Sequence, residues 1–249
     1  MSDHKNNLIL VSYLNTIPFI EGFRLHPHHK FNLIYKTPSL GTEMFFNGES
    51  DFALIPIGGL LGRNDYEICT DFCIGCEGPV RTVGVFSDVD LDKIKTVYLD
   101  SDSRTSVLLV KILFDALGYK DIIWKEGIQY YFESDRSSSG FLAIGDKVFE
   151  YENKFSHFLD LGKTWNNVFQ LPFAFALFVK KPSIPESDVK ELNAILKTGI
   201  SNIPNLDLKE FSYIGGIQEY YSRNISYHFD AQKKEAVKLF FEKVENLKL

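Results

Sequence analysis

The sequence predicts an α/β protein made of two lobes, and three observations lead to that prediction. Short apolar runs alternate with helix-like segments through the first 60 residues, which is the pattern of strands joined by crossover helices. A second series of this kind runs from about residue 90 to 172. The length of 249 residues is enough for one large domain or two small ones.

The elements of the first series are placed by their apolar runs and by their helix start and stop signals. "PSLGTEMFFNGE" begins with Pro and Ser and ends at Gly48, as helices commonly do. We expect strands at 7–12, 31–37 and 51–57, with helices at 16–24 and from Pro38 to Gly48.

The later elements follow from the same signals, and the best of them is the helix "SRTSVLLVKILFDALG", which Gly118 ends. We expect strands at 66–75, 80–87, 96–100, 121–126 and 172–181, strand–turn–helix at 139–152, strand and helix at 155–169, and helices at 185–200, about 207–222 and 230–247.

The helical tail has no sheet of its own, so we expect it to pack on the first series. This gives a discontinuous lobe of residues 1–88 with 176–249 and a second lobe of residues 89–175. Ligands of open α/β sheets bind at the carboxyl ends of strands, so we expect a central cleft between the lobes.

Composition excludes several classes of protein. A net charge of −6 argues against a nucleic-acid partner, and no apolar run approaches the length of a membrane span. The start, "MSDHKNNLILVSYLN", lacks the pattern of a signal peptide, so we expect a cytoplasmic protein.

The three cysteines have the spacing C-x3-C-x2-C of a radical-SAM iron–sulfur cluster. They lie between two strand-like runs instead of after the first strand of a barrel. We therefore favour reduced, partly buried thiols, with neither a metal nor a disulfide. The histidines of "HPHH" lie in a loop without matching carboxylates, and we expect that loop to be solvated.

Polar turns follow four of the predicted strands. The most informative is "DSRTS", where Ser103, Arg104, Thr105 and Ser106 open the long helix. Unpaired N–H groups at a helix start, together with hydroxyls and a guanidinium, can bind a carboxylate or phosphate. The alternative is equally open: the hydroxyls cap the helix and the arginine faces water.

The other three turns also carry hydrogen-bonding groups and also have plain structural explanations. "SYLNT" brings Ser12 and Asn15, and the amide could be an ordinary turn residue. "CEGPVRT" brings Gly78 and Arg81, which could be a solvated strand residue. "IGD" brings Gly145 and Asp146, which could be a helix cap. No phosphate loop, Ser-His-Asp set or pair of glutamates stands out.

Several of these segments, in this order, resemble one known family: "VSYLNTIPF", "DFALIPI", "CIGCEGPVRTV", "LDSDSRTSVLLVKIL", "FLAIGDKVF", "DLGKTWNNVFQLPFAFALFV" and "RNISYHFD". The sequence is similar to the chorismate dehydratases of the futalosine route to menaquinone. The resemblance implies a fold like the type II periplasmic binding proteins and a hydro-lyase without a cofactor. It implies conversion of chorismate, a small-molecule substrate, to 3-[(1-carboxyvinyl)oxy]benzoate and water.

Two segments depart from the family pattern, Cys76-Glu77 and Phe169-Gln170, which affects the fine contacts of their turns. A 1,4-dihydroxy-6-naphthoate synthase-like enzyme and a non-catalytic small-anion-binding protein remain alternatives. The oligomeric state, monomer or homodimer, also stays open.

The expected site is rich in neutral donors and poor in obvious bases. We hypothesise that Asn15 is the catalytic residue that orients the substrate, and that the enolpyruvyl carboxylate of chorismate removes the C3 proton. Ser103, Thr105, Ser106 and the helix start are candidates to bind one carboxylate, and Ser12, Asn15 and backbone N–H groups near Gly78 are candidates to bind the other. The remaining candidate substrate contacts are Arg81, Arg104, Gly145 and Asp146. Alignment of this kind can contribute roughly 7–11 kcal/mol to lowering a barrier.

Overall fold

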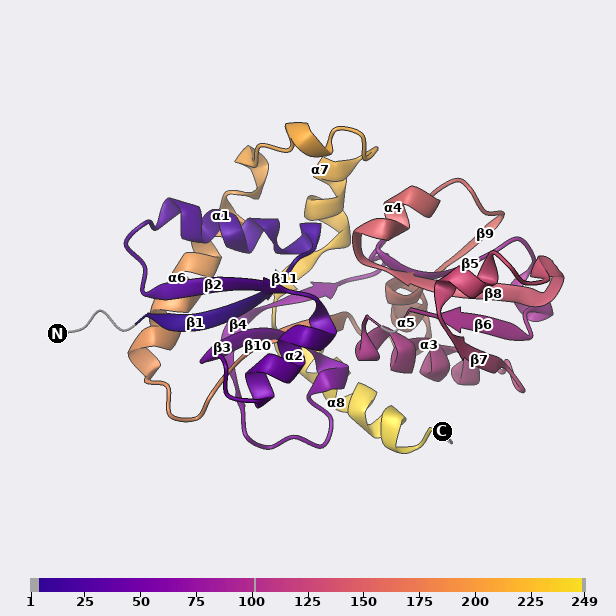
Figure 1. Cartoon of the computed structure of the whole chain (residues 1–249), viewed down its shortest axis with the longest axis horizontal. Coiled ribbons are helices and arrows are strands. Elements are labelled where there is room, and N and C mark those ends of the chain that lie inside the picture. Colours follow the sequence, from indigo (N-terminus) through magenta and orange to yellow (C-terminus); the bar gives the residue numbers. More distant parts are fainter. Residues whose placement is uncertain (1–4, 101, 248–249) are drawn as a thin grey trace. The chain divides into compact units, whose positions relative to one another are not determined.

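The computed structural model describes residues 5–100 and 102–247 and confirms an α/β protein with two mixed sheets. The chain forms two compact units, each with its own sheet (Figure 1). The first consists of the chain up to Gly75 with Ala174–Ala231, and the second of Cys76–Phe173 with the chain from Gln232.

The sheet of the first unit has the strand order β11-β4-β10-β3-β1-β2. Its strands are β1 (Asn6–Val11), β2 (Phe31–Lys36), β3 (Phe52–Pro56), β4 (Glu67–Cys76), β10 (Phe173–Lys180) and β11 (Ser226–His228). Strand β1 runs parallel to β2 and β3, whereas β10 is antiparallel to β3 and β11 is antiparallel to β4. The carboxyl end of β1 therefore leads directly into the "SYLNT" turn.

Two helices of the first unit approach each other closely at Gly22. Its helical elements are η1 (Leu14–Thr16), α1 (Ile17–Leu25), α2 (Pro38–Phe46), η2 (Ile57–Gly59), α6 (Glu186–Ser201), η7 (Ile203–Asn205), η8 (Lys209–Phe211), α7 (Ile217–Glu219) and the π-helical turn η9 (Tyr220–Asn224). Helix α1 lies against α6, and a β-carbon added to Gly22 would lie 2.2 Å from the carbonyl oxygen of Ile195. Only glycine permits this approach.

The second unit has the strand order β7-β6-β8-β5-β9. Its strands are β5 (Val83–Ser87), β6 (Thr96–Leu99), β7 (Ile123–Glu126), β8 (Ser139–Ile144) and β9 (His157–Asp160). Strands β7, β6 and β8 are parallel, and β5 is antiparallel to both β8 and β9. The carboxyl ends of β6 and β8, which are neighbours, thus lie at one edge and carry the "DSRTS" and "IGD" turns.

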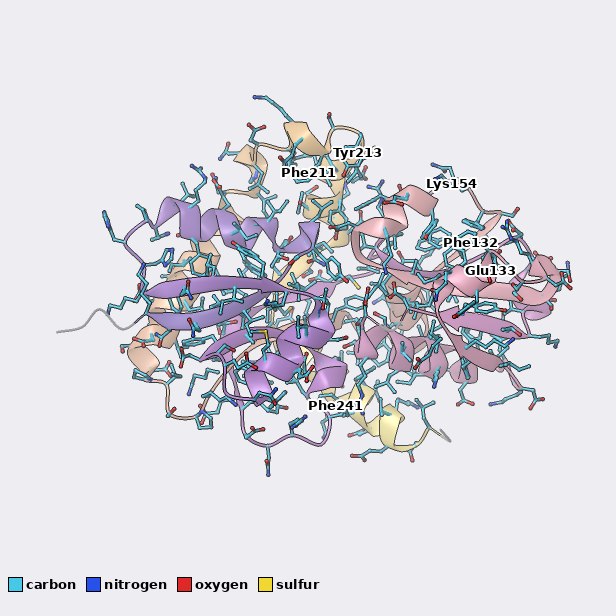
Figure 2. All side chains as sticks on the ribbon, in the orientation of Figure 1. Phe132, Glu133, Lys154, Phe211, Tyr213 and Phe241 are labelled. Atoms are coloured by element: carbon cyan, nitrogen blue, oxygen red, sulfur yellow. The ribbon has the colours of Figure 1, made fainter. Side chains whose placement is uncertain are left out.

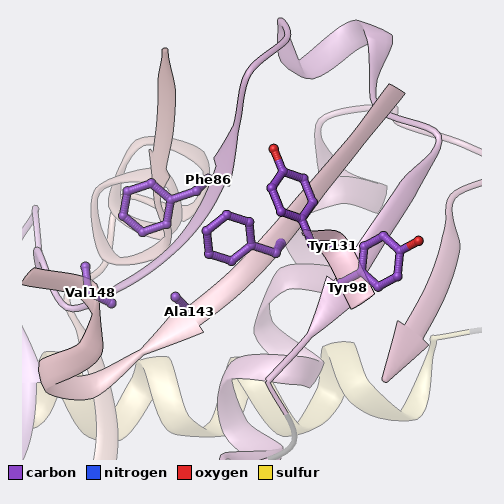
Figure 3. Packing of buried hydrophobic residues seen from close by; sticks show 6 residues of the cluster. Phe86, Tyr98, Tyr131, Ala143 and Val148 are labelled. Carbon is purple, nitrogen blue, oxygen red and sulfur yellow. The ribbon is translucent and has the colours of Figure 1, made fainter. Parts of the chain in front are cut away.

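Helices cover both faces of the second sheet (Figure 1). They are α3 (Arg104–Ala116), α4 (Val148–Tyr151) and α5 (Leu161–Phe169), with short 3-10 turns at Leu91–Lys93, Ile128–Tyr131, Arg136–Ser138 and Gly145–Lys147. Helix α8 (Ala231–Glu245) belongs to this unit from Gln232 onward. On one face an aromatic cluster forms a core, in which the ring of Phe141 lies 5.4 Å from that of Phe86 and 4.7 Å from that of Tyr131 (Figure 3).

The division of the chain differs from the expected one near residues 88 and 176. Strand β5 pairs with β8 and β9, so the chain has already joined the second sheet by Val83. The helical tail was expected to pack on the first series, but the chain from Gln232 belongs to the second unit. There the ring of Phe240 packs edge-on, 5.6 Å from that of Phe173.

The predicted helix at about 207–222 is wrong. The segment forms η8, a turn and α7, which passes into η9. Gly216 adopts a φ of 68°, which a regular helix does not permit, and Tyr213 in the turn is 78% exposed (Figure 2). Strand β11, only three residues long, was not predicted.

Candidate functional site

The first set of candidate residues lies in the turn between β1 and α1. Ser12 is exposed, and its backbone N–H donates to the carbonyl of Lys36 at 3.2 Å. Asn15 is half-buried in η1. Its side-chain oxygen lies 3.4 Å from the hydroxyl oxygen of Thr16, which is itself fully buried.

Thr16 fixes this turn, and our sequence reasoning missed its role. Its hydroxyl lies 2.7 Å from the carbonyl oxygen of Val11 and 2.8 Å from that of Tyr13. The end of the strand is thereby tied to the start of the helix. The available signal was the position of Thr16 directly before Ile17-Pro18. Proline is favoured in the first turn of a helix, so it marks Thr16 as the residue at the helix start.

The second set begins at the N-terminus of α3. Ser103 is its N-cap, and its hydroxyl accepts from the N–H of Ser106 at 3.4 Å and from the hydroxyl of Ser106 at 3.2 Å. Thr105 and both serines are buried, whereas Arg104 is exposed. The capping interpretation of Ser103 is confirmed. The aligned peptide dipoles of α3 give this helix start a partial positive charge, which attracts anions.

Lys147, from the turn after β8, lies beside the start of α3 and was not predicted. Its ammonium nitrogen is 2.5 Å from a carboxylate oxygen of Asp100 and 3.3 Å from one of Asp102. Burial raises the pKa of Asp100, which is 4% exposed, while Lys147 opposes that rise. The lysine thereby offsets two negative charges that would otherwise repel an anion from this helix start.

The "IGD" turn is bonded to the turn before β5. Gly145 has a φ of 67°, and its N–H donates to the carbonyl of Thr82 at 2.8 Å. Asp146 is half-buried and is not the cap of α4, because Lys147 occupies that position without a side-chain cap bond. The capping interpretation of Asp146 is therefore wrong.

Arg81 is held in an ion pair and is not the solvated residue considered above. Its Nε and Nη2 atoms lie 2.6 and 2.8 Å from the two carboxylate oxygens of Glu152, and its guanidinium lies 5.0 Å from the ring centre of Phe149. This paired guanidinium has less capacity to bind a substrate carboxylate than an unpaired one has.

Asp160 holds the backbone of the "CEGPVRT" turn. Its carboxylate accepts from the N–H groups of Val80 at 3.1 Å, Arg81 at 2.7 Å and Lys163 at 2.9 Å. Burial raises its pKa, and these donors oppose the rise. Gly78 precedes Val80 and Arg81 in the chain. Its φ of 134° is a backbone conformation that glycine adopts more easily than other residues, because it has no β-carbon.

A buried lysine supports the same turn from α8. Lys233 is fully buried, and its ammonium nitrogen lies 3.0 Å from a carboxylate oxygen of Glu77. Glu77 belongs to one of the two departures from the family pattern. Glu77 therefore has a charged partner, Lys233, within this chain.

The cysteines do not form a cluster site. All three lie on β4, where the odd spacing of Cys73 and Cys76 puts their side chains on opposite faces. None of the three is joined in a disulfide, and burial raises the pKa of Cys69 and of Cys76 to about 12. Cys73 and Cys76 are buried and Cys69 is half-buried, which agrees with the expected burial of the cysteines. In the part of the chain that the structure describes, no group of three or more His, Cys, Asp or Glu could hold a metal ion.

The histidine loop makes local contacts. A ring nitrogen of His26 lies 2.9 Å from the carbonyl oxygen of Gly22, and a ring nitrogen of His29 accepts from the N–H of Phe31 at 3.1 Å. Within residues 5–100 and 102–247, no helix is both long and apolar enough to cross a bilayer.

Comparisons with known proteins agree with the fold. A family model described as menaquinone biosynthesis matches residues 8–246. A chorismate dehydratase of Thermus thermophilus is 23% identical over 258 residues, which cover 94% of this chain and 93% of that protein.

Two solved structures share the architecture at low identity. One is a Candida albicans protein described as having the generic periplasmic binding protein fold, with a TM-score of 0.69 and 12% identity over 98% of this chain and 91% of that one. The other is the aliphatic sulphonate binding protein SsuA of Escherichia coli, with a TM-score of 0.64 and 13% identity over 96% and 92% of the two chains. The predicted periplasmic-binding-protein-like fold is confirmed.

Proposed function

We propose that this chain, which belongs to the menaquinone biosynthesis family, is an enzyme that dehydrates chorismate. The products are 3-[(1-carboxyvinyl)oxy]benzoate and water. The distant chorismate dehydratase relative supports the specific reaction. The structural observation that carries the proposal is the start of α3, where buried hydroxyls surround a helix N-terminus.

The start of α3 suits a carboxylate. The first N–H groups of a helix lack partners within the helix and bear a partial positive charge. Ser103 and Ser106 add hydroxyls, and Lys147 offsets the charge of Asp100 and Asp102. The proposal assigns one carboxylate of chorismate to this turn, with Thr105 and the exposed Arg104 as further donors.

The turn after β1 would orient the substrate. The Asn15 amide can donate or accept a hydrogen bond but is a poor base. The proposal gives it the orienting role, with Ser12 and the backbone near Gly78 as donors to the substrate. The turn of Gly145 and Asp146 remains a candidate contact, and Arg81 is the weakest candidate because Glu152 already pairs with it.

The reaction needs one proton transfer and one leaving group. The C3–H bond of chorismate breaks, and its proton passes to the enolpyruvyl carboxylate of the same molecule. The electron pair delocalises toward the ring carboxylate and then expels the C4 hydroxyl. The proton recombines with this hydroxide to form water, and the ring becomes aromatic. Donors aimed at the ring carboxylate stabilise the negative charge that develops there.

The test follows the loss of the diene absorbance of chorismate with wild-type protein and with two variants. Asn15→Ala should lower kcat at least about a hundredfold, because alignment is lost. Arg104→Ala should raise KM, whereas a solvated Arg104 would leave it unchanged. Lys154→Ala, an exposed lysine in the same unit, is the control for lost surface charge.

Other outcomes would support the alternatives. Full activity of Asn15→Ala would remove that residue from the mechanism. Turnover of cyclic dehypoxanthinylfutalosine in place of chorismate would indicate a 1,4-dihydroxy-6-naphthoate synthase-like enzyme. Chorismate recovered bound but unchanged would indicate a small-anion-binding protein.

A further inference from the structure

Two buried tyrosines donate hydrogen bonds to consecutive carbonyls of the turn that carries Asn15. The hydroxyl of Tyr221 lies 2.9 Å from the carbonyl oxygen of Leu14, and that of Tyr227 lies 3.0 Å from the carbonyl oxygen of Asn15. The two side chains are 1% and 4% exposed. Both come from more than 200 residues further along the chain, yet both belong to the same unit as the turn.

The elements that supply these tyrosines are unusual in the fold. Tyr221 lies in the π-helical turn η9, which closes with a bond of 3.1 Å from the N–H of Ile225 to the carbonyl of Tyr220. Such turns occur frequently at functional sites. Tyr227 lies in β11, inside the "RNISYHFD" segment, for which the proposed reaction gives no role.

The carbonyl of Asn15 lacks one possible backbone donor, and the hydroxyl of Tyr227 takes that donor's place. Pro18, three residues after Asn15, has no N–H, so a 3-10 bond to the carbonyl of Asn15 cannot form. The Tyr227 hydroxyl supplies a donor there. Its ring is held edge-on against that of Phe19, with the ring centres 5.2 Å apart. A buried hydroxyl strongly favours a partner, so this carbonyl is held in one direction.

We propose that Tyr221 and Tyr227 are positioning residues that fix the backbone of Leu14 and Asn15 and thereby aim the Asn15 amide. This inference rests on the orienting role that the proposed function gives to Asn15. Neither tyrosine needs to touch the substrate. The role of the "RNISYHFD" segment is then to hold the turn after β1.

The test uses phenylalanine variants, which keep the rings and remove only the hydroxyls. Tyr227→Phe and Tyr221→Phe are each expected to lower kcat about tenfold, with KM changed less than about twofold, because orientation is lost before affinity. Tyr131→Phe is the matched control. Its hydroxyl donates to Asp88 at 3.2 Å, and neither residue belongs to a candidate turn, so its loss should leave kcat unchanged.

A double-substitution cycle separates positioning from general stabilisation. In an Asn15→Ala background, the further change Tyr227→Phe should have no additional effect on kcat, because both act through one amide. Independent, multiplicative losses would overturn the proposal.

Hydrogen exchange gives a readout that does not depend on the reaction. Amides of residues 13–17 should exchange at least about tenfold faster in the double Tyr→Phe variant, while those of β6 should not change. Unchanged exchange at 13–17 would overturn the positioning role even if chorismate is turned over. Faster exchange in a protein that does not dehydrate chorismate would refute only the proposed reaction.

Discussion

The ammonium nitrogen of Lys147 lies 2.5 Å from a carboxylate oxygen of Asp100, at the shared carboxyl edge of β8 and β6. Asp100 is almost completely buried, so its charge depends on this partner. The pair links the "IGD" turn to the start of α3, which the proposal assigns to a substrate carboxylate.

Replacing Lys147 by Met should therefore destabilise the protein. We expect the free energy of unfolding to fall by about 3 kcal/mol, because a buried charge loses its partner. Urea unfolding at pH 7 measures the change. The double variant Lys147→Met with Asp100→Asn should recover most of it, and Lys154→Met should change little. A Lys147→Met protein as stable as wild type would refute the role of the pair.

Removing the cap hydroxyl of α3 should affect both stability and substrate binding. Ser103→Ala is expected to lower the free energy of unfolding by about 1 kcal/mol through the lost cap. If α3 binds a carboxylate, the same change raises KM for chorismate. Asp135→Ala is the matched control, since Asp135 caps a short exposed turn by accepting from the N–H of Ser137 at 2.9 Å. Equal KM values in the two variants would argue against a substrate site at α3.

Gly78 should resist substitution although space surrounds it. No atom beyond Gly78 and its two chain neighbours lies within 4 Å of the place a β-carbon would take, yet its φ of 134° is rare for other residues. Gly78→Ala is expected to lower the free energy of unfolding by about 1–3 kcal/mol through backbone strain. Gly215→Ala, at an equally open position without a positive φ, should be tolerated. Thermal unfolding measures the stability of both variants. Equal stability of Gly78→Ala and Gly215→Ala would contradict backbone strain at position 78.

The buried cysteines should be inert near neutral pH. Because burial raises the pKa of Cys76 to about 12, only about one thiol in 10⁴ is ionised at pH 8 in the folded protein. Iodoacetamide should label Cys76 slowly in the native state and quickly in guanidinium chloride, as counted by mass spectrometry. Rapid native labelling would contradict the buried position.

The same pKa shift predicts the direction of alkaline unfolding. The unfolded thiol ionises near pH 9, whereas the folded Cys76 thiol ionises at about 12. The protonated thiol therefore favours the folded state, and this stabilisation is complete below pH 9 and is lost as the pH rises toward 12. Cys76→Ala should weaken the decline of stability over this interval, which urea unfolding at several pH values measures.

The sequence predicted the regular elements well because their signals are local. The apolar run before Ser12 and the stop at Gly118 correspond closely to β1 and α3. Strand β11 was missed because three residues are too few to show the alternation of apolar and polar side chains that marks a strand. Its pairing with β4 depends on contacts distant in sequence. The boundary at Gly75 was missed for the same reason, since only the pairing of β5 reveals its sheet.

The candidate turns were predictable, but their supporting residues were not. Ser103 and Ser106 stand in a recognisable cap pattern. No local sequence signal marks Lys147. The partners of Arg81 and Leu14, which are Glu152 and Tyr221, are 71 and 207 residues away in the chain. Such pairs become visible only when the fold brings distant segments together.

The identity of the reaction is most directly tested by incubating metal-free protein with chorismate and analysing the mixture by mass spectrometry. We predict a product lighter than chorismate by one water, with the proton spectrum of a benzoate substituted at position 3, and its formation about a hundredfold more slowly by Asn15→Ala. Chorismate that remains unchanged with the wild-type protein would contradict it.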